Sequence, residues 1–425
     1  MRRYESYKDS GVEWMGEVPS HWEISSLGKI FLSVSEKNRP DLPLLSITRE
    51  LGVIERDTED QDSNHNFIPD DLSNYKILKK GQFGMNKMKA WQGSYGVSNF
   101  TGIVSPAYYI FDFIKSINPQ FFHWAIRSKI YVSFFGSASD GVRIGQWDLS
   151  KSRMKSIPFI IPSNNEQQKI AQFLDDKTAK IDQAVNLAEK QIALLKEHKQ
   201  ILIQNAVTRG LNPDVPLKDS GVEWIGQVPE HWDVKKLKNI ALIFNGATPS
   251  SNNQDYWDGN IVWITPKDIN NIKFITSSER KITQKGYENC GSYLVSPGTI
   301  VITTRAPIGK VAITDVELCT NQGCKSLVLN EKINNIFLYY YLTVSTEYLN
   351  SLGSGTTFME LSGTALGIIK VPFPSIQEQQ QIADYLDTQT AKIDQAIALK
   401  TAHIEKLKEY KSVLINDVVT GKVQV

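Results

Sequence analysis

The side chains best suited to binding a charged partner lie in a basic stretch of the first half of the chain. No aspartate or glutamate occurs between Asp71 and Asp112, whereas five lysines do: Lys76, Lys79, Lys80, Lys87 and Lys89. Trp91 and Gln92 follow on a glycine-rich segment. Ammonium groups without nearby carboxylates favour contacts with phosphate oxygens. Scattered lysines also occur on ordinary solvated surfaces, but the interleaved tryptophan and glutamine favour a phosphate-contacting surface.

A second set of candidate residues can form hydrogen bonds with the edges of nucleic-acid bases. The loop Ser137–Trp147 carries Arg143 and Gln146. Arginine makes paired hydrogen bonds to guanine, and glutamine makes them to adenine. The second half of the chain offers polar and basic residues at comparable places: Arg305, Lys310, Asn321, Gln322, Lys325, Thr356 and Thr357. We therefore predict a DNA-binding surface in each half.

The elements predicted around these residues form two similar bodies. In the first body, Gln82–Met88 and Ala107–Phe113 are predicted strands and Pro119–Ile130 is a predicted helix. In the second body, the corresponding elements are strands at Thr299–Thr304 and Ala312–Thr314 and a helix at Phe337–Thr346. The two bodies share this skeleton but differ in side chains, as expected if two modules keep a common frame and bind different sequences.

Each body is preceded by a repeated motif, which we call the opening motif. Its two copies, Lys8–Trp22 and Lys218–Trp232, are identical at 12 of 15 positions and lie 210 residues apart. The chain is therefore a tandem repeat. A repeated pattern of tryptophan, proline and histidine can mark a functional site, but a structural role is favoured. We expect His21 and His231 to be packing or capping residues rather than catalysts.

Each body is followed by a long amphipathic helix with an unbroken heptad pattern. The first copy, Gln167–Ala206, recurs 212 residues later, and each helix is about 35 residues or roughly 50 Å long. Apolar residues occupy the seam in both copies: Leu174, Ile181, Ile192 and Leu195, and then Leu386, Ile393, Ile404 and Leu407. Two ordinary bundle helices would explain one such pattern, whereas two matched copies favour a mutual coiled coil.

The connections between these segments predict the architecture. The four segments are 1–163, 164–210, 211–375 and 376–425. Each helix begins where its own body ends, so the two helices can pair only if they run antiparallel. The end at Thr420-Gly421 should then return to the N-terminus. The predicted fold is α+β: two α/β domains separated by an antiparallel coiled coil, in a circular arrangement with a pseudo-two-fold axis.

Composition limits the class of protein. The formal net charge is +1, so contacts with nucleic acid must come from local patches rather than from overall charge. No apolar stretch is long enough for a membrane span or a secretory signal, and three cysteines suit a reducing compartment, so we expect a cytoplasmic protein. No phosphate loop, dinucleotide loop, nucleophile elbow or metal-ligand cluster is present. We predict no catalytic residue and no metal site.

The repeated motifs resemble those of one family. The opening motif, the Glu-Gln-Gln that opens each helix at Glu166 and Glu378, and the Thr-Ala-Lys-Ile-Asp-Gln-Ala core at Thr178 and Thr390 are similar to the specificity subunits of Type I restriction–modification systems. This resemblance covers the whole chain. It implies two target-recognition domains, each binding one half of a split DNA sequence, joined by spacer helices.

The resemblance also implies the partners. Double-stranded DNA, two adenine-N6 methyltransferase subunits and restriction or translocase subunits would assemble with this chain. The chain itself would bind no cofactor, while S-adenosylmethionine and ATP with magnesium would belong to the partner subunits. Two other readings are an assembly scaffold whose bodies bind proteins or glycans, which the near-neutral charge favours, and a stand-alone enzyme, for which the sequence holds no motif.

Overall fold

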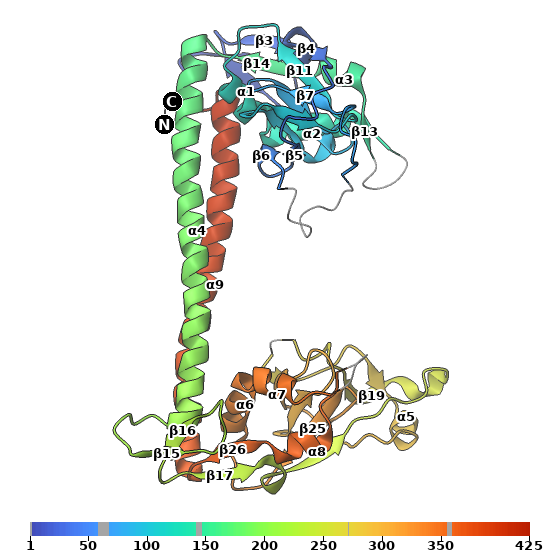
Figure 1. Ribbon diagram of the computed structural model, residues 1–425, viewed down its shortest axis with the longest axis vertical. Helices are drawn as coiled ribbons and strands as arrows, with labels where there is room; N and C mark the ends of the chain where they lie inside the picture. Colours follow the sequence, from blue (N-terminus) through green and yellow to red (C-terminus); the bar gives the residue numbers. More distant parts are fainter. Residues whose placement is uncertain (1, 58–67, 142–146, 271, 355–358) are drawn as a thin grey trace. The chain divides into compact units, whose positions relative to one another are not determined.

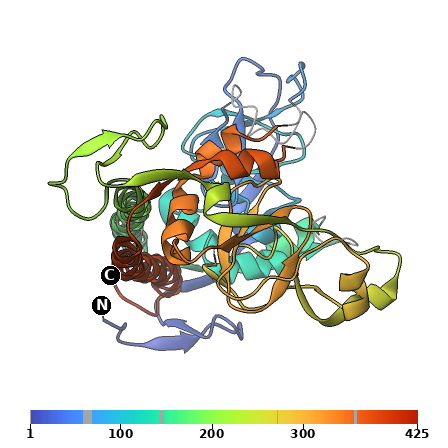
Figure 2. The same cartoon turned by 90° about the horizontal axis from the view of Figure 1, so that it is seen from below.

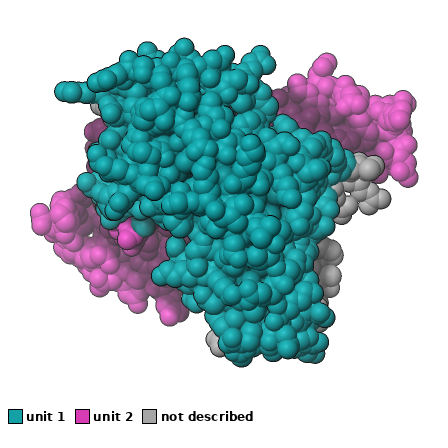
Figure 3. Space-filling model, turned by 90° about the horizontal axis from the view of Figure 1, so that it is seen from above, with its two compact units in different colours: residues 1–189, 401–425 teal, residues 190–400 magenta. Residues whose placement is uncertain are grey.

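Two compact units make up the computed structural model, which describes residues 2–57, 68–141, 147–270, 272–354 and 359–425. Unit 1 comprises residues 1–189 and 401–425, and unit 2 comprises residues 190–400 (Figure 3). Each unit therefore combines one body, the first part of the helix that follows it and the last part of the other long helix.

Unit 1 contains a body built from short strands and short helices. Its strands are β1 (Tyr7–Asp9), β2 (Glu17–Pro19), β3 (Glu23–Ser26), β4 (Phe31–Val34), β5 (Leu45–Thr48), β6 (Gly52–Glu55), β7 (Lys76–Leu78), β8 (Phe83–Met85), β9 (Tyr95–Val97), β10 (Gly102–Val104), β11 (Tyr109–Phe113), β12 (Ser139–Asp140), β13 (Asp148–Leu149) and β14 (Pro158–Ile161). Its helices are η1 (Leu27–Lys29), η2 (Ala90–Gln92), α1 (Pro119–Ile126), α2 (Lys129–Ser137), α3 (Lys151–Ser156) and the first part of α4 (Asn164–Arg209).

The central sheet of unit 1 is antiparallel, in the order β4-β11-β8-β9. Alternation along β11 divides its side chains between two cores. Phe111 packs with Phe31 and Phe83 on the face toward α1, whereas Ile110 belongs to a smaller core with Ile47 of β5. The predicted strands at Gln82–Met88 and Ala107–Phe113 are present as β8 and β11, but β8 is shorter than predicted, because Asn86–Met88 belong to the loop that follows it.

The predicted helix Pro119–Ile130 is wrong in its extent, because two helices occupy this region. Asn118 caps α1 by accepting hydrogen bonds from the backbone N–H groups of Gln120 and Phe121, which fixes where α1 begins. The chain leaves the helix at Arg127 and starts α2 after Ser128, so α1 and α2 are separate elements.

Unit 2 contains the second body. Its strands are β15 (Leu217–Asp219), β16 (Gln227–Pro229), β17 (Asp233–Lys236), β18 (Ala241–Asn245), β19 (Trp257–Ile264), β20 (Phe274–Ile275), β21 (Lys281–Ile282), β22 (Ile300–Thr303), β23 (Val311–Thr314), β24 (Leu318–Thr320), β25 (Cys324–Leu329) and β26 (Lys370–Phe373). Its helices are η3 (Leu237–Asn239), η4 (Gln254–Tyr256), α5 (Gln284–Glu288), α6 (Asn335–Val344), α7 (Thr346–Ser351), α8 (Gly363–Ile368) and part of α9 (Ile376–Val419).

The central sheet of unit 2 repeats that of unit 1. Its order is β18-β25-β22-β23-β20, so its first four strands correspond to β4-β11-β8-β9. The strand β20 is an addition that pairs in parallel with β23. The predicted strands at Thr299–Thr304 and Ala312–Thr314 are confirmed as β22 and β23. The predicted helix at Phe337–Thr346 is α6, which begins earlier because Asn334 caps it.

The two long helices run antiparallel within each unit (Figure 1). In unit 2, Lys199 of α4 pairs with Asp394 of α9 at 2.6 Å, and Gln191 accepts a hydrogen bond from Lys400 at 2.7 Å. The residue number falls along α9 as it rises along α4, which confirms the antiparallel prediction. In unit 1, Lys411 pairs with Asp182 at 2.6 Å, the equivalent ion pair under the 212-residue repeat.

Both helices are longer than the predicted 35 residues. The helix α4 has 46 residues and α9 has 44, or roughly 70 and 66 Å at 1.5 Å per residue. The additional first turn of α4 is stabilised by a capping box, in which Ser163 and Glu166 exchange hydrogen bonds between side chain and backbone. The seam residues are buried or half-buried: Leu174, Ile181, Ile192, Leu195, Leu386, Ile393, Ile404 and Leu407.

The opening motif of each unit forms the junction where one long helix ends and the other begins. In unit 1, buried Trp22 donates a hydrogen bond from Nε1 to Glu166 at 3.2 Å and lies against Gly421, which follows α9. His21 lies 2.9 Å from the same carboxylate, a contact near the start of α4 that agrees with the predicted packing or capping role. In unit 2, His231 lies 3.1 Å from Glu378 and the Trp232 ring lies against Gly210, but Trp232 Nε1 has no hydrogen-bond partner among the described residues.

The two chain ends meet in unit 1, as predicted. The Tyr7 hydroxyl donates a hydrogen bond to the carbonyl of Gly421 at 3.1 Å, and Arg2 forms a β-bridge with Gln424. The marked termini lie beside each other in Figure 2. The circular connection predicted from the repeat is therefore present in this unit.

Candidate nucleic-acid interface

A groove of about 950 Å³ crosses the surface of unit 1 between the β5–β6 hairpin and the loop that follows β8. Lys89 and Gln92 line it, together with Arg49 and Arg56 from the hairpin. Carboxylates of the hairpin also reach the groove: Glu50, Glu55 and Asp57. The groove thus offers cationic, amide and anionic groups, a mixture that can contact phosphates and base edges together.

The loop after β8 is held by its own side chains. The amide of buried Asn86 accepts a hydrogen bond from Met88 N–H at 3.2 Å and lies 3.3 Å from the Tyr108 hydroxyl. Gly93 ends η2 with a φ of 93°, a conformation that glycine adopts at little cost. The fixed loop leaves Lys89 exposed, and within the described part of the chain its ammonium group has no hydrogen-bond or ion-pair partner.

Lys87 differs from Lys89, because it already has an anionic partner. Its ammonium group lies 2.9 Å from a carboxylate oxygen of Asp148, and this hydrogen bond raises the pKa of Lys87. Burial lowers the pKa of nearby Lys76, and the positive charges of Lys37, Lys151 and Lys87 lower it further. These four lysines therefore form a cationic cluster, although one of them is neutralised by Asp148.

Trp91 is held by another tryptophan. Its ring packs against Trp147, with 5.0 Å between ring centroids. The predicted base-contacting residues Arg143 and Gln146 lie outside the described residues, as do Thr356 and Thr357 of unit 2.

In unit 2 the structure gathers candidate residues near the ends of β22 and β24. Arg305 pairs with Glu360 at 3.0 Å, and Thr304 N–H donates to the carbonyl of Gly323 at 2.8 Å. Asn321 and Gln322 lie on that same turn, and Lys310 N–H donates to the Thr303 hydroxyl at 3.0 Å.

Lys325 lies inside this region rather than on its surface. Its side chain is buried and donates a hydrogen bond to Asn245 at 2.7 Å. Burial lowers its pKa, Glu360 raises it and Arg305 lowers it again. Lys325 is therefore positioned to support the polar groups around it rather than to reach a distant phosphate.

The acidic partners of these cations were missed by sequence reasoning. Asp148 and Glu360 occupy equivalent places, 212 residues apart and just before α3 and α8, and they pair with Lys87 and Arg305 respectively. The repeat offset was the signal that could have revealed them. Arg49 and Arg56 were missed because short hairpins carry no strong periodicity.

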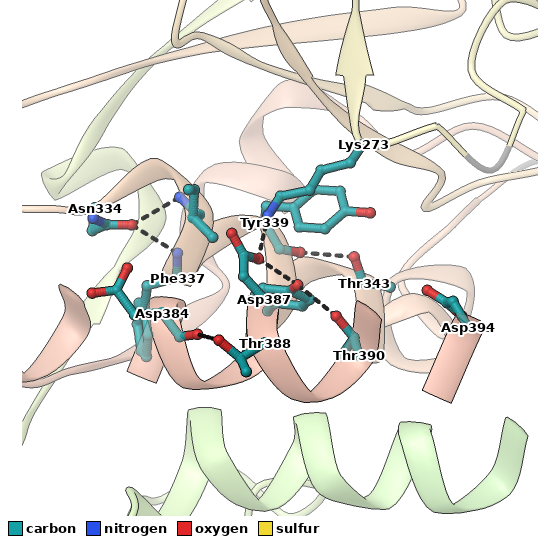
Figure 4. A network of polar contacts seen from close by, with 12 residues as sticks. Lys273, Asn334, Phe337, Tyr339, Thr343, Asp384, Asp387, Thr388, Thr390 and Asp394 are labelled. Atoms are coloured by element: carbon teal, nitrogen blue, oxygen red, sulfur yellow. Dashed lines mark hydrogen bonds and ion pairs between the residues drawn. The ribbon is translucent and has the colours of Figure 1, made fainter. Parts of the chain in front are cut away.

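Half-buried polar contacts connect each body to its long helix. In unit 2, Asp387 of α9 accepts a hydrogen bond from the Tyr340 hydroxyl at 2.6 Å and also contacts Lys273 (Figure 4). In unit 1, the equivalent Asp175 accepts from Trp124 Nε1 at 2.7 Å. A rigid joint of this kind holds the candidate surface in a fixed orientation to the helix of the same unit.

The residues that the structure describes offer neither a metal site nor a membrane-spanning helix. Among them, no three His, Cys, Asp or Glu side chains are grouped to hold a metal ion. In the same residues, no helix combines the length and apolar character needed to cross a membrane.

Comparisons with known proteins agree with the repeated architecture. The family model of the Type I restriction modification DNA specificity domain matches residues 19–192 and 229–409. The MjaIX specificity subunit of a Type I restriction enzyme from Methanocaldococcus jannaschii is 44% identical over 166 residues, which is 38% of each chain. The EcoR124I/EcoR124II specificity subunit from Escherichia coli is 28% identical over 64% of this chain and 65% of its own length.

Solved structures share the fold. A chain solved in work on complex assembly and conformational transition of the type I R-M system superimposes with a TM-score of 0.76 at 15% identity, over 96% of this chain and 99% of that chain. The HsdS subunit from Thermoanaerobacter tengcongensis superimposes with a TM-score of 0.59 at 16% identity, over 96% of this chain and 98% of its own.

Proposed function

This chain belongs to the Type I restriction modification DNA specificity domain family, and on that premise we propose that it is the DNA-recognition subunit of a Type I restriction–modification complex. Each unit would bind one half of a bipartite target. The chain would be non-catalytic, and its contribution would be to select the DNA sequence and to position other subunits on it.

The observation that supports this proposal is that the two units share a backbone arrangement but present different side chains on it. The sheets, the opening motifs, the caps Asn118 and Asn334 and the ion pairs of Asp148 and Glu360 are equivalent in the two units. The side chains presented around that frame differ, with Lys87 in one unit and Arg305 in the other. A shared frame with different polar groups suits two modules that bind chemically related but unequal half-sites.

The long helices provide candidate docking surfaces for two methyltransferase subunits. In unit 2, Leu194 of α4 and Leu399 of α9 are 64% and 66% exposed although the helices already bury a seam between them. In unit 1, Leu187 and Val413 are also exposed. Apolar side chains beyond the seam favour association with further helices.

Under this proposal the chemistry belongs to the partners. Methyltransferase subunits would bring S-adenosylmethionine, and restriction or translocase subunits would bring ATP and magnesium. The residues of this chain would bind and orient double-stranded DNA, and the half-buried contacts of Asp175 and Asp387 would hold each body on its helix.

Co-expression with the methyltransferase subunits, followed by mapping of N6-methyladenine in the host DNA, tests the proposal. We expect methylation at one motif with two fixed halves and an indifferent spacer. A complex that assembles but methylates no such motif, and that binds duplex DNA without salt dependence, would instead favour a scaffold for proteins or glycans.

The docking surface is tested by charge substitution. We expect Leu194→Glu to reduce co-purification with the methyltransferase, because a carboxylate would be buried in an apolar contact. Lys196→Glu, an exposed position two residues away, serves as the matched control. Equal co-purification of both variants with the wild-type chain would exclude docking at Leu194.

A further inference from the structure

A second pocket lies beside the groove of unit 1 and is lined by three cationic side chains. It has a volume of about 370 Å³, and its charged lining residues are Arg49, Arg127 and Lys129. Gln92 adds an amide group, and the described lining of the pocket includes no carboxylate. A concave site with three cations and an amide is suited to an anion with several oxygen atoms.

Arg127 is the least exposed of these cations. Its guanidinium group donates hydrogen bonds to the backbone carbonyls of Tyr95 at 2.8 Å, Arg49 at 2.8 Å and Glu50 at 2.7 Å. Among the described residues no carboxylate lies within ion-pair distance of it, although burial lowers its pKa. A charged group partly removed from water is stabilised by an opposite charge, and among the carboxylates of the described residues only Glu50 acts in this way, from beyond ion-pair distance, by raising the pKa of Arg127.

The other two cations lie at the rim. Arg49 is largely exposed, and its only ion pair among the described residues is a 3.7 Å contact with Glu50. Lys129 is exposed and is the first residue of α2. The Ser128 side chain does not cap that helix, and its buried hydroxyl has no partner in the described part of the chain. The uncapped N-terminus of α2 therefore adds partial positive charge beside Lys129.

Unit 2 shows that these charges are not part of the common frame. Asn118 and Asn334, the equivalent helix caps, lie 216 residues apart. At the same offset, Arg127 corresponds to Thr343 and Lys129 corresponds to Ser345. The second body thus forms the same pair of helices without either cation, so neither cation is needed to form that pair.

We propose that the pocket formed by Arg49, Gln92, Arg127 and Lys129 is a phosphate-binding site that holds a backbone phosphate of DNA whose bases lie in the adjoining groove. Arg49 and Gln92 line both the pocket and the groove, so the two sites are continuous. The assignment to DNA rests on the proposed function, whereas the assignment to phosphate rests on the pocket itself. Such a contact fixes the register of the strand while the groove contacts its bases.

The test measures duplex binding by the full chain as a function of salt concentration. The variant is Arg49→Gln with Lys129→Gln, because both side chains are exposed and neither supports the backbone as Arg127 does. Lys29→Gln with Lys169→Gln is the matched control, with two exposed lysines of unit 1 outside the pocket. Equal melting temperatures establish that each variant is folded. A parallel titration with inorganic phosphate, followed by ³¹P NMR, tests free phosphate.

We expect the slope of log K against log salt to become shallower by about 0.9 in the pocket variant, the loss of one phosphate contact, and to stay unchanged in the control. An unchanged slope together with loss of inorganic phosphate binding would support a phosphate site but overturn its assignment to DNA. No change in either measurement would overturn the proposal. If the wild-type chain shows no salt-dependent duplex binding, the proposed function fails, and the phosphate titration alone decides the pocket.

Discussion

Replacing Gly421 by alanine tests the junction that closes unit 1. Gly421 follows α9 with a φ of 75°, and it completes a Schellman motif in which Lys422 N–H donates to Asp417 O at 2.9 Å. A Cβ atom at Gly421 would lie 2.4 Å from Cδ of Pro19 and 3.1 Å from the Trp22 ring. Both neighbours belong to the opening motif, whose buried packing leaves little room for movement.

Two costs add in this variant. A left-handed conformation costs an alanine about 1–2 kcal/mol relative to glycine. The contact with Pro19 adds an overpacking cost of about 1–3 kcal/mol. Gly16→Ala is the control for the first cost alone, because Gly16 has a φ of 65° and nothing within 4 Å of its Cβ position. We therefore expect Gly421→Ala to destabilise unit 1 by about 2–5 kcal/mol, and Gly16→Ala by about 1–2 kcal/mol.

Hydrogen–deuterium exchange resolved by peptide is the appropriate assay, because it reports the stability of each unit separately. The Gly421→Ala variant should lose protection at both chain ends, in the opening motif and in the last turns of α9. Equal loss of protection in the Gly421→Ala and Gly16→Ala variants would refute the packing argument, since strain alone would then explain both.

Three further predictions concern binding, pH and the joint between body and helix. Lys89→Ala should weaken duplex binding regardless of sequence and make the slope of log K against log salt shallower by about 0.9. Lys87→Ala should change both quantities less, because Asp148 already neutralises Lys87. Equal effects of the two substitutions in filter-binding assays would contradict this distinction. Burial lowers the pKa of His123 from 6.5 to about 4, so between these two pH values the unfolded chain binds more protons than the folded chain. The free energy of unfolding should therefore fall by up to roughly 3 kcal/mol as the pH drops through this window. Urea unfolding at several pH values checks this, because the His123→Gln variant should lack the pH-dependent step. Gln167→Leu should lower the free energy of unfolding by about 1–3 kcal/mol for each of the two backbone groups that it leaves unpaired, Asn118 N–H and Pro162 O. The control Gln168→Leu, at an exposed position, should leave the free energy of unfolding almost unchanged in the same urea measurement.

Short-range patterns explain why much of the fold was predictable. The heptad spacing of Leu174 and Ile181 and the strand patterns around Phe83 and Phe111 reflect periodicities that a few neighbouring residues establish. Because the chain is a repeat, the elements predicted in one body could then be assigned to corresponding residues of the other body. The extent of α1 was missed, because no glycine or proline marks the place where the chain leaves the helix at Arg127 and starts α2 after Ser128.

The candidate surface was predictable in kind but not in detail. Composition pointed to the basic stretch that holds Lys87 and Lys89, yet it did not distinguish a paired lysine from an unpaired one. That difference depends on Asp148, which lies 61 residues beyond Lys87 in the chain. In the same way, Lys325 is a surface candidate by residue type, but the sheet buries it against Asn245.

The sequence by itself determined the repeat, the family resemblance, the antiparallel helices and the return of the chain end to its start, because each follows from local spacing and connectivity. Only the tertiary structure decided which cations keep their charge available and where they converge. Arg49, Gln92 and Arg127 come from a hairpin turn, the short helix η2 and the link between α1 and α2, and sequence spacing does not specify the register that brings them together. Their convergence is set by packing of the sheet and helices, which depends on the whole body at once.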